Sequence, residues 1–298
     1  MHQSPLNLWL EHVGDKDVGR ITTQDLRAYL AWLRADYKPR RFSRADHPLS
    51  PKTVRNHWVT LAAFFSWASQ ELEQPNPMKG VPPPKFEEAP VEPFTKEEME
   101  ALLKVCDHCQ EAQPRNRRRF VMRRPTGHRD HAIVLMLLDT GLRASELCSL
   151  KTGDVDLKTG KVEVKHGQQG GAKGGKGRTV FLGKAARSAV WRYLAHREEN
   201  PDPAAPLFIG KFNRPLNRDG LRQMLGTLGE KAKIKKCHPH RFRHTFAITY
   251  LRSGGDVFTL QALLGHSSLE MAQHYARIAQ IDVEQAHHRA SPADNWRL

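Results

Sequence analysis

The stretch His238–Tyr275 reads HPHRFRHTFAITYLRSGGDVFTLQALLGHSSLEMAQHY, and it combines histidine, arginine and tyrosine with apolar residues at helical spacing. His240 and Arg243 lie three residues apart, so they share one face of a helix that continues through TFAITYL. Two glycines then break this helix. After LLGH, the SSLE sequence forms a capping box, which predicts that Tyr275 lies on a new short helix.

These residue types together indicate phosphate chemistry that does not require a metal. Arg243 offers a planar, permanently charged fork that matches phosphate oxygens. His240 and His266 can donate hydrogen bonds or transfer protons near neutral pH. Tyr275 is the candidate nucleophile. A free tyrosine has a pKa of about 10, so it needs a base and a neutralised phosphate before it attacks.

Local signals mark the ends of several helices. Thr22 or Thr23 caps a helix that continues to about residue 35, and Ser50 with the following proline begins another. Thr95 and Glu98 form a capping box for a third helix. The run HAIVLMLLDTG is typical of a buried helix, and we expect it to end at Gly141.

Four segments resemble the boxes of the tyrosine recombinases, the phage integrase and Xer-like family. HPHRFRH is similar to the His-x-x-Arg box, LLGHSSLEMAQHY to the Leu-Leu-Gly-His through Tyr box, TGLRASEL to the first arginine box, and AKGGKGRTVFL to the lysine hairpin. Their order fits as well, because Arg143 precedes His240 by 97 residues and the hairpin lies between them. The resemblance is close over residues 95–285 and looser over 20–90.

The resemblance implies a mainly α-helical chain with a small antiparallel β-sheet. It implies an N-terminal helical core-binding (SAM-like) domain over residues 1–80, which clamps DNA, and a C-terminal α+β catalytic domain over residues 94–298. Residues 81–93 are the expected linker, because the segment 75–93 holds seven prolines, which prevent a regular helix. A change to a period of two between residues 155 and 182 predicts three strands, DVDL, KVEV and RTVFL.

The resemblance also implies how a phosphodiester would be cleaved. Tyr275 attacks the scissile phosphate, which forms a 3′-phosphotyrosyl enzyme and releases a 5′-hydroxyl. Arg143 and Arg243 hold the non-bridging oxygens and stabilise the charge of the transition state. Glu146, three residues after Arg143, is expected to support it by a salt bridge.

Three further residues are expected to move protons or donate hydrogen bonds. His240 is the candidate base for Tyr275, His266 is a further donor to the phosphate, and Lys173 is the acid that protonates the leaving oxygen. The bond energy is conserved in the covalent intermediate. We therefore expect neither a nucleotide cofactor nor a metal.

The charge of the chain predicts a nucleic-acid partner. The formal net charge is +15 and the pI is near 9.9. The first 90 residues carry a net charge of +2 and the remainder +13, so we expect the polyanion to bind the C-terminal part. An arginine-rich stretch at 115–129 either follows the phosphate backbone or is a solvated loop. The tentative DNA contacts are Arg117, Arg118, Arg119, Lys176 and Arg241.

Two patterns resemble metal sites without completing one. Cys106 and Cys109 form a C-x-x-C, but no second pair follows, so buried or surface thiols are the simpler interpretation. Asp154 and Asp156 resemble a D-x-D metal pair and are interpreted as turn residues at the start of a strand. The four cysteines form no disulfide framework, and neither a signal peptide nor an apolar run of membrane-spanning length is evident. These features predict a cytoplasmic protein, associated with the nucleoid when it is bound to DNA.

The favoured function is site-specific recombination of double-stranded DNA. The expected assembly is a homotetramer on two recombination sites, with a monomer or a weak association in the absence of DNA and no membrane partner. Three alternatives remain: a type IB topoisomerase-like nicking-closing enzyme, a non-catalytic DNA-binding relative and a histidine-rich metalloprotein. The Leu-Leu-Gly-His box and the small helical N-terminal region favour the recombinase over the topoisomerase.

Overall fold

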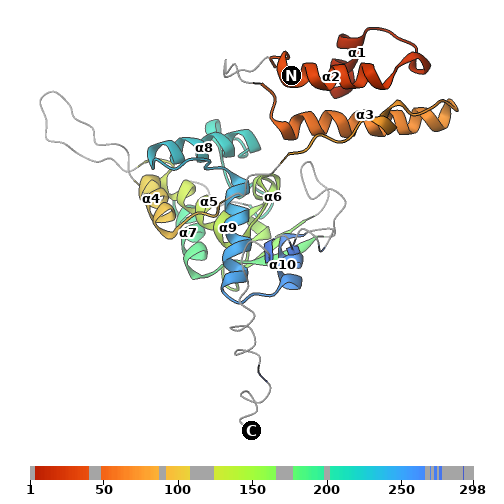
Figure 1. Ribbon diagram of the computed structural model, residues 1–298. Helices are drawn as coiled ribbons and strands as arrows, with labels where there is room; N and C mark the ends of the chain where they lie inside the picture. Colours follow the sequence, from red (N-terminus) through yellow and green to blue (C-terminus); the bar gives the residue numbers. More distant parts are fainter. Residues whose placement is uncertain are drawn as a thin grey trace, which may run out of the picture. The chain divides into compact units, whose positions relative to one another are not determined.

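The chain divides into two compact units, Met1–Pro90 and Val91–Leu298 (Figure 1). The fold is known from a computed structural model. It describes residues 4–39, 48–86, 92–107, 124–165, 177–197, 202–265, 269, 272–273, 275–276 and 291.

The N-terminal unit is built from helices that contact one another pairwise. Its described elements are α1 (Pro5–Val13), α2 (Thr23–Ala35), α3 (Pro51–Glu71) and short 3₁₀ turns at Val18–Arg20 and Pro77–Gly80. Thr22 caps α2 by a capping box with Asp25, and Ser50 caps α3. Both helix starts agree with the prediction from the sequence. Each cap satisfies a backbone N–H that the first turn would otherwise leave without a partner.

Aromatic side chains fill the core of this unit. Tyr29 and Phe65 are fully buried, and the ring of Trp9 meets the ring of Tyr29 edge-on at 5.0 Å between centroids. The hydroxyl of Tyr29 lies 3.0 Å from Nδ1 of His57, which is also buried. Burial lowers the pKa of His57. The core therefore contains a neutral, hydrogen-bonded histidine.

The proline-rich segment begins in contact with α3. Val81 belongs to the core of the N-terminal unit, and Trp58 donates from Nε1 to its carbonyl oxygen at 3.0 Å. Arg55 donates to the carbonyl oxygen of Pro84 at 3.2 Å. The chain thus stays on α3 for several residues beyond residue 80, where the linker was expected to start.

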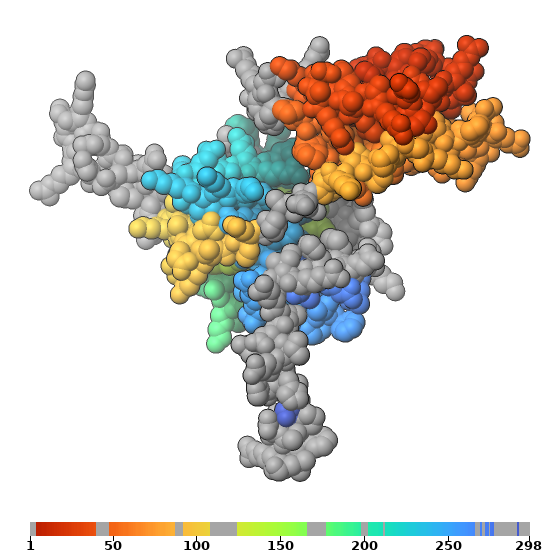
Figure 2. All heavy atoms as spheres, in the orientation of Figure 1, coloured from red at the N-terminus to blue at the C-terminus, as the bar shows by residue number. Residues whose placement is uncertain are grey.

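The C-terminal unit surrounds one buried helix. Its described elements are α4 (Lys96–Asp107), α5 (Gly127–Thr140), α6 (Ala144–Ser149), α7 (Lys184–Ala195), α8 (Arg218–Lys231), α9 (Pro239–Arg252) and α10 (Val257–Leu264), two short 3₁₀ turns at Thr152–Asp154 and Lys211–Asn213, and strands β1 (Lys161–Val164) and β2 (Arg178–Phe181). Helix α5 contacts α4, α7 and α9, which is why its sequence is apolar on most faces. On the outside, α4 and α8 lie side by side on the face seen in Figure 2, where they are yellow and cyan.

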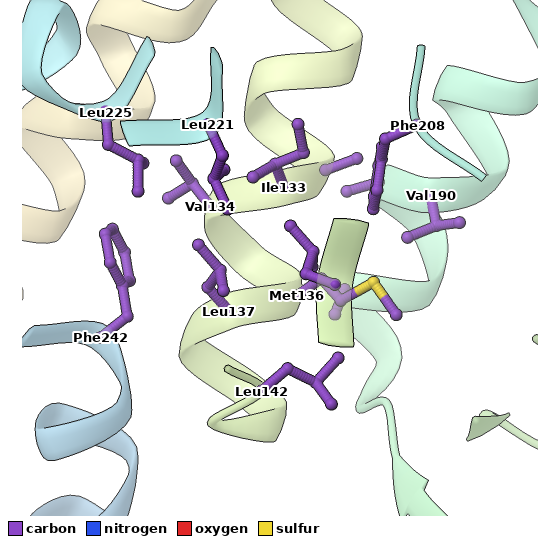
Figure 3. Packing of buried hydrophobic residues seen from close by; sticks show 14 of the residues in the cluster. Ile133, Val134, Met136, Leu137, Leu142, Val190, Phe208, Leu221, Leu225 and Phe242 are labelled. Atoms are coloured by element: carbon purple, nitrogen blue, oxygen red, sulfur yellow. The ribbon is translucent and has the colours of Figure 1, made fainter. Parts of the chain in front are cut away.

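The core side chains explain how α5 orders the helices around it. Leu137 of α5 points toward Phe242 of α9, with Leu221 of α8 above them (Figure 3). Val190 of α7 lies on the other side of α5 in the same view. Phe242 is fully buried although it lies between two arginines, Arg241 and Arg243, in the sequence. Its burial fixes the rotation of α9 and hence the face that the neighbouring residues present.

The sheet has one strand fewer than the sequence predicts. Strands β1 and β2 pair antiparallel, with Val162 opposite Val180, whereas Val155 contributes only an isolated bridge to Val162. The reason is local, because Asp154 and Asp156 each accept a hydrogen bond from a backbone N–H of their own turn. These bonds compete with a strand ladder. The interpretation of the two aspartates as turn residues is confirmed, and the first predicted strand is wrong.

The possible zinc ligands do not form a site among the described residues. Cys106 is fully buried in the core, and burial raises the pKa of its thiol. Cys109 lies outside the described residues. Across the part of the chain that the structure describes, no group of three or more histidine, cysteine, aspartate or glutamate residues is arranged to hold a metal ion. In the same part, every helix is too short or too polar to cross a bilayer.

Candidate active site

Arg143 reaches its place because the chain reverses at a glycine. Helix α5 ends at Gly141, which adopts the left-handed conformation with φ of +60°. A Cβ atom at this position would lie 2.5 Å from the ring of Phe246 and 2.8 Å from Leu264. Only glycine satisfies both the dihedral angle and the close approach. The reversal places Arg143 at the N-cap of α6.

Glu146 holds Arg143 through both its main chain and its side chain. The backbone N–H of Arg143 donates to Oε2 of Glu146 at 2.8 Å, and its Nη1 donates to Oε1 at 2.9 Å. The salt bridge expected from the sequence is therefore present. The carboxylate is fully buried, whereas about a third of the Arg143 side chain (32%) is exposed. Arg143 is thus anchored inside the protein by Glu146, while part of its side chain stays accessible to solvent.

A second arginine binds the same carboxylate, and the sequence did not indicate it. Arg178, the first residue of β2, donates from Nη1 and Nη2 to the two oxygens of Glu146 at 2.8 and 2.7 Å. Burial alone would raise the pKa of Glu146, but the hydrogen bonds and charge of Arg178, and then those of Arg143, outweigh it and lower the pKa to about 2. The sequence signal that could have pointed to this contact is an arginine at the start of a strand, directly after the glycine-rich loop.

The end of α10 binds three arginines with three consecutive carbonyl oxygens, those of residues 263–265. Arg178 donates from Nε to the first at 2.7 Å, Arg243 from Nη2 to the second at 2.7 Å, and Arg143 from Nη2 to the third at 3.2 Å. These oxygens carry the negative end of the helix dipole and lack partners within the helix. The Leu-Leu-Gly motif therefore gathers the three positive charges through its main chain.

Arg243 is the most enclosed of the three arginines. Its side chain extends from α9, its residue is only 4% exposed, and its Nη1 donates to the carbonyl oxygen of Gly141 at 2.9 Å. Burial, followed by the charge of Arg143, lowers the pKa of Arg243 to about 10. The guanidinium is still charged at neutral pH. Arg243 thus links the ends of α5 and α10 across the site.

His240 lies on α9 one turn before Arg243, and its side chain is exposed. Partial loss of solvent around the imidazole, followed by the charges of Arg243, Arg222 and Arg143, lowers its pKa. His240 is therefore held in the neutral form at neutral pH. A neutral imidazole has one nitrogen that can accept a proton, which is the form that a general base requires.

Tyr275 is in helical conformation and packs against α9 and α10. Its side chain contacts an apolar cluster that includes Leu251 and Leu264, and the centroid of its ring lies 5.3 Å from that of His244. Burial raises the pKa of Tyr275, and the charges of Arg243 and Arg143 act in the opposite direction. The phenol is thus enclosed, and burial, which disfavours its ionised form, outweighs the charges of the two arginines, which favour it.

Arg241 differs from its expected role as a DNA contact. The residue is 7% exposed, and its Nη2 donates to Oε2 of Glu98 at 2.7 Å. Its Nη1 donates to the carbonyl oxygen of Lys235 at 2.9 Å, and its guanidinium lies 4.0 Å from the centre of the Phe94 ring. The charge is neutralised within the protein, which argues against a DNA contact. Arg241 instead ties the start of α9 to the start of α4.

The remaining candidates lie outside the described residues. These are His266, Lys173, Lys176, Arg117, Arg118 and Arg119, together with the capping box Ser267 and Glu270.

Comparison with known proteins identifies the family of the chain. Residues 92–281 match the model of the "Phage integrase family". The chain belongs to the phage integrase family. It is 34% identical to tyrosine recombinase XerC of Bacillus subtilis (strain 168) over 238 residues, which cover 78% of this chain and 72% of the relative. It is 30% identical to tyrosine recombinase XerC of Staphylococcus epidermidis, over 90% of this chain and 81% of the relative. The resemblance to the Xer-like tyrosine recombinases is confirmed.

Solved structures of this family have the same fold. The crystal structure of XerA recombinase aligns with a TM-score of 0.51 and 25% identity, over 97% of this chain and 89% of that chain. The Tn1549 transposon integrase in complex with transposon right end DNA aligns with a TM-score of 0.69 and 20% identity, over 91% of this chain and 86% of that chain. The predicted fold class, mainly helical with a small antiparallel sheet, is confirmed.

Proposed function

We propose that this tyrosine recombinase breaks and rejoins DNA strands at a specific site through a 3′-phosphotyrosyl intermediate on Tyr275. The observation that carries the proposal is the meeting of Arg143 and Arg243 at the end of α10, where both charges act on Tyr275. Two guanidinium groups beside a tyrosine suit a phosphodiester, because they bind its non-bridging oxygens and favour the ionised phenol.

The reaction divides into two phosphoryl transfers. In the first, the oxygen of Tyr275 attacks phosphorus, the bond to the 5′-oxygen breaks, and the leaving oxygen takes a proton. In the second, the 5′-hydroxyl of a partner strand attacks the phosphotyrosine, and the phenol is released. Arg143 and Arg243 stabilise the charge that develops on the oxygens in each transition state. Each transfer exchanges one phosphate ester for another, so no external energy source is required.

Proton transfer is assigned to His240 and Lys173, with His266 as a further donor. His240, whose pKa is lowered, would accept the proton of Tyr275. Lys173 would protonate the leaving 5′-oxygen, and His266 would donate a further hydrogen bond to the phosphate. His266 follows Gly265, whose carbonyl oxygen binds Arg143. This sequence position supports the assignment of His266.

The partner is proposed to be a double-stranded recombination site, bound by a homotetramer that spans two sites. The net charge of +13 after residue 90 supports binding along the phosphate backbone, with Lys176 and Arg117–Arg119 as contacts. The N-terminal domain would clamp the duplex, connected by residues 81–93 to the catalytic domain at 94–298. Related solved complexes include XerH site-specific recombinase bound to its difH substrate. We infer a cytoplasmic location.

A nicked suicide substrate tests the assignment of the nucleophile. Cleavage of such DNA releases a short strand, so the covalent complex accumulates and appears on a denaturing gel. Tyr275→Phe should bind DNA but form no adduct, because only the hydroxyl is removed. Tyr250→Phe is the matched control, since Tyr250 packs against the same apolar cluster and should form the adduct like the wild type. A persistent adduct with Tyr275→Phe would overturn the assignment. Recombinant product between two sites then distinguishes strand exchange from simple nicking and closing.

A further inference from the structure

Arg178 has the contacts of an active-site residue but takes no direct part in the proposed phosphoryl transfers. Its side chain is only 9% exposed, and its three donor nitrogens bind Glu146 and the end of α10. All three nitrogens are occupied and two of them pair with a carboxylate, which offsets the charge, so Arg178 is poorly placed to bind a phosphate. Any effect on the reaction must therefore pass through the groups that it holds.

The two oxygens of Glu146 are shared evenly between two arginines. Oε1 accepts from Nη1 of Arg143 and Nη1 of Arg178, and Oε2 accepts from the backbone N–H of Arg143 and Nη2 of Arg178. Arg143 therefore gives only one nitrogen of its guanidinium to the carboxylate. Its Nη2 turns toward the carbonyl oxygen of Gly265.

Removing Arg178 would change this division. A carboxylate and a guanidinium pair best through two parallel hydrogen bonds. Without Arg178, the buried carboxylate of Glu146 would have acceptor sites to fill, and the nearest flexible cation is Arg143. A bidentate pair would draw the guanidinium of Arg143 toward Glu146 and away from Gly265. The arginine would remain in the protein but would be misplaced for a phosphate.

We propose that Arg178 is a positioning residue for strand cleavage: it holds Glu146 so that Arg143 keeps its fork directed at the scissile phosphate. The inference rests on the proposed function, in which Arg143 binds that phosphate. Because Arg178 also binds the carbonyl oxygen of Leu263, it ties the strand that follows the glycine-rich loop to the helix that precedes His266.

Loss of Arg178 should change how cleavage depends on pH. Glu146 is faced by Arg143 at the start of its own helix, by Arg178 from β2 and by Arg243 from α9. Since burial opposes ionisation of Glu146, loss of Arg178 should raise its pKa. Protonated Glu146 can no longer accept all the bonds that fix Arg143. As the solution is acidified, the cleavage rate of an Arg178 variant should therefore begin to fall at a higher pH than the cleavage rate of the wild type.

Arg129 provides a matched control within the same unit, because it ends the arginine-rich stretch 115–129 but its own guanidinium is bound inside the protein. Arg129 also binds a fully buried carboxylate, donating to Asp130 at 2.9 and 2.7 Å, and it also donates to a main-chain oxygen, that of Ile209, at 2.9 Å. Its side chain is 16% exposed, compared with 9% for Arg178. The two substitutions to methionine should cost similar stability. Arg129 has no described contact with the residues of the candidate site.

The experiment measures single-turnover cleavage of the nicked substrate from about pH 5 to 9 at saturating protein. Arg178→Met should bind DNA within about twofold of the wild type but cleave about 100-fold more slowly, as expected for a misplaced catalytic group. The acidic limb of its pH–rate profile should lie at a higher pH than that of the wild type. Arg178→Lys, which restores a charge but not the fork, should recover part of the rate. Arg129→Met should keep the wild-type rate and pH profile.

The outcomes separate this inference from the proposed function. If the wild type forms the adduct, and Arg178→Met cleaves at the wild-type rate with an unchanged acidic limb, the positioning role is overturned and the proposed function stays intact. An adduct with Tyr275→Phe would instead overturn the nucleophile assignment. If thermal melting shows that Arg178→Met is unfolded, the pH profile of Arg178→Lys decides instead. A shift of its acidic limb to higher pH supports the positioning role, and an unchanged acidic limb contradicts it.

Discussion

Arg243 donates a hydrogen bond from Nη2 to the main-chain oxygen of Leu264 at 2.7 Å, and this bond joins the helix of the His-x-x-Arg box to the Leu-Leu-Gly-His box. The other terminal nitrogen of Arg243 binds the carbonyl oxygen of Gly141, at the end of α5. One guanidinium therefore holds two helix ends that are far apart in the sequence. It also brings its own charge next to the charge of Arg143.

Replacement of Arg243 should impair both folding and cleavage. Arg243→Ala leaves two buried carbonyl oxygens without a partner, so the free energy of unfolding should fall by about 1–3 kcal/mol per lost acceptor contact. Cleavage should fall at least about 100-fold, because a preorganised donor to the phosphate is removed. Arg243→Lys should be more stable than Arg243→Ala but equally slow, since a lysine cannot bridge both oxygens. Denaturant unfolding and single-turnover cleavage measure the two effects. A fast Arg243→Lys variant would contradict the prediction.

Gly141 and Gly226 should respond in opposite directions to alanine. Gly141 has a φ of +60° and a Cβ would clash with Phe246, so Gly141→Ala should destabilise the C-terminal unit by more than about 1 kcal/mol. Gly226 lies within α8, and a Cβ there meets no atom within 4 Å. Gly226→Ala should stabilise the protein by about 0.5–1 kcal/mol. Chemical denaturation of both variants tests the pair, and equal effects would contradict it.

The buried His57 should make the N-terminal unit sensitive to acid. Burial lowers the pKa of His57 in the folded state, so the unfolded chain binds the proton more readily. Stability should be fully present above the ordinary histidine pKa of about 6.5 and should be lost as the pH falls below it. Unfolding curves at about pH 8 and 5.5 measure this loss. His57→Gln should make the stability less dependent on pH. If the variant and the wild type lose the same stability in acid, a group other than His57 causes the loss.

The affinity for DNA should depend steeply on salt. Phosphate contacts release counterions, so the logarithm of the binding constant should fall linearly with the logarithm of the salt concentration between about 50 and 200 mM. The charge of +13 after residue 90 predicts that residues 91–298 account for most of this slope. Fluorescence anisotropy of a labelled duplex measures it. Binding that is insensitive to salt would argue against contacts along the phosphate backbone.

The role of Lys173 can be tested by changing the leaving atom. Sulfur leaves without a proton, so a 5′-bridging phosphorothiolate at the scissile position should restore cleavage to Lys173→Ala. Arg143→Ala should not be restored, because its proposed partners are the non-bridging oxygens. Lys176→Ala should resemble the wild type on both substrates. If Lys176→Ala shows the defect and the rescue instead, the acid lies three residues further along the glycine-rich loop.

The sequence alone determined the features that depend on neighbouring residues. The starts of α2, α3 and α4 follow from capping side chains within four residues of the bonds that they form, and Gly141 ends α5 because of its own backbone preference. The family boxes were equally readable, because the spacing of their residues along a helix is local. The pair of Arg143 and Glu146 belongs to this class, since the two residues lie three apart.

The tertiary structure alone decided which arginines face solvent. Arg241 and Arg178 look as available for DNA as any other arginine in the sequence, yet Arg241 binds Glu98, 143 residues away, and Arg178 binds Glu146, 32 residues away. An arginine is neutralised inside a protein only when folding brings a carboxylate or a free helix end to it. That meeting depends on the packing of α4, α9, α10 and β2, which no local pattern records.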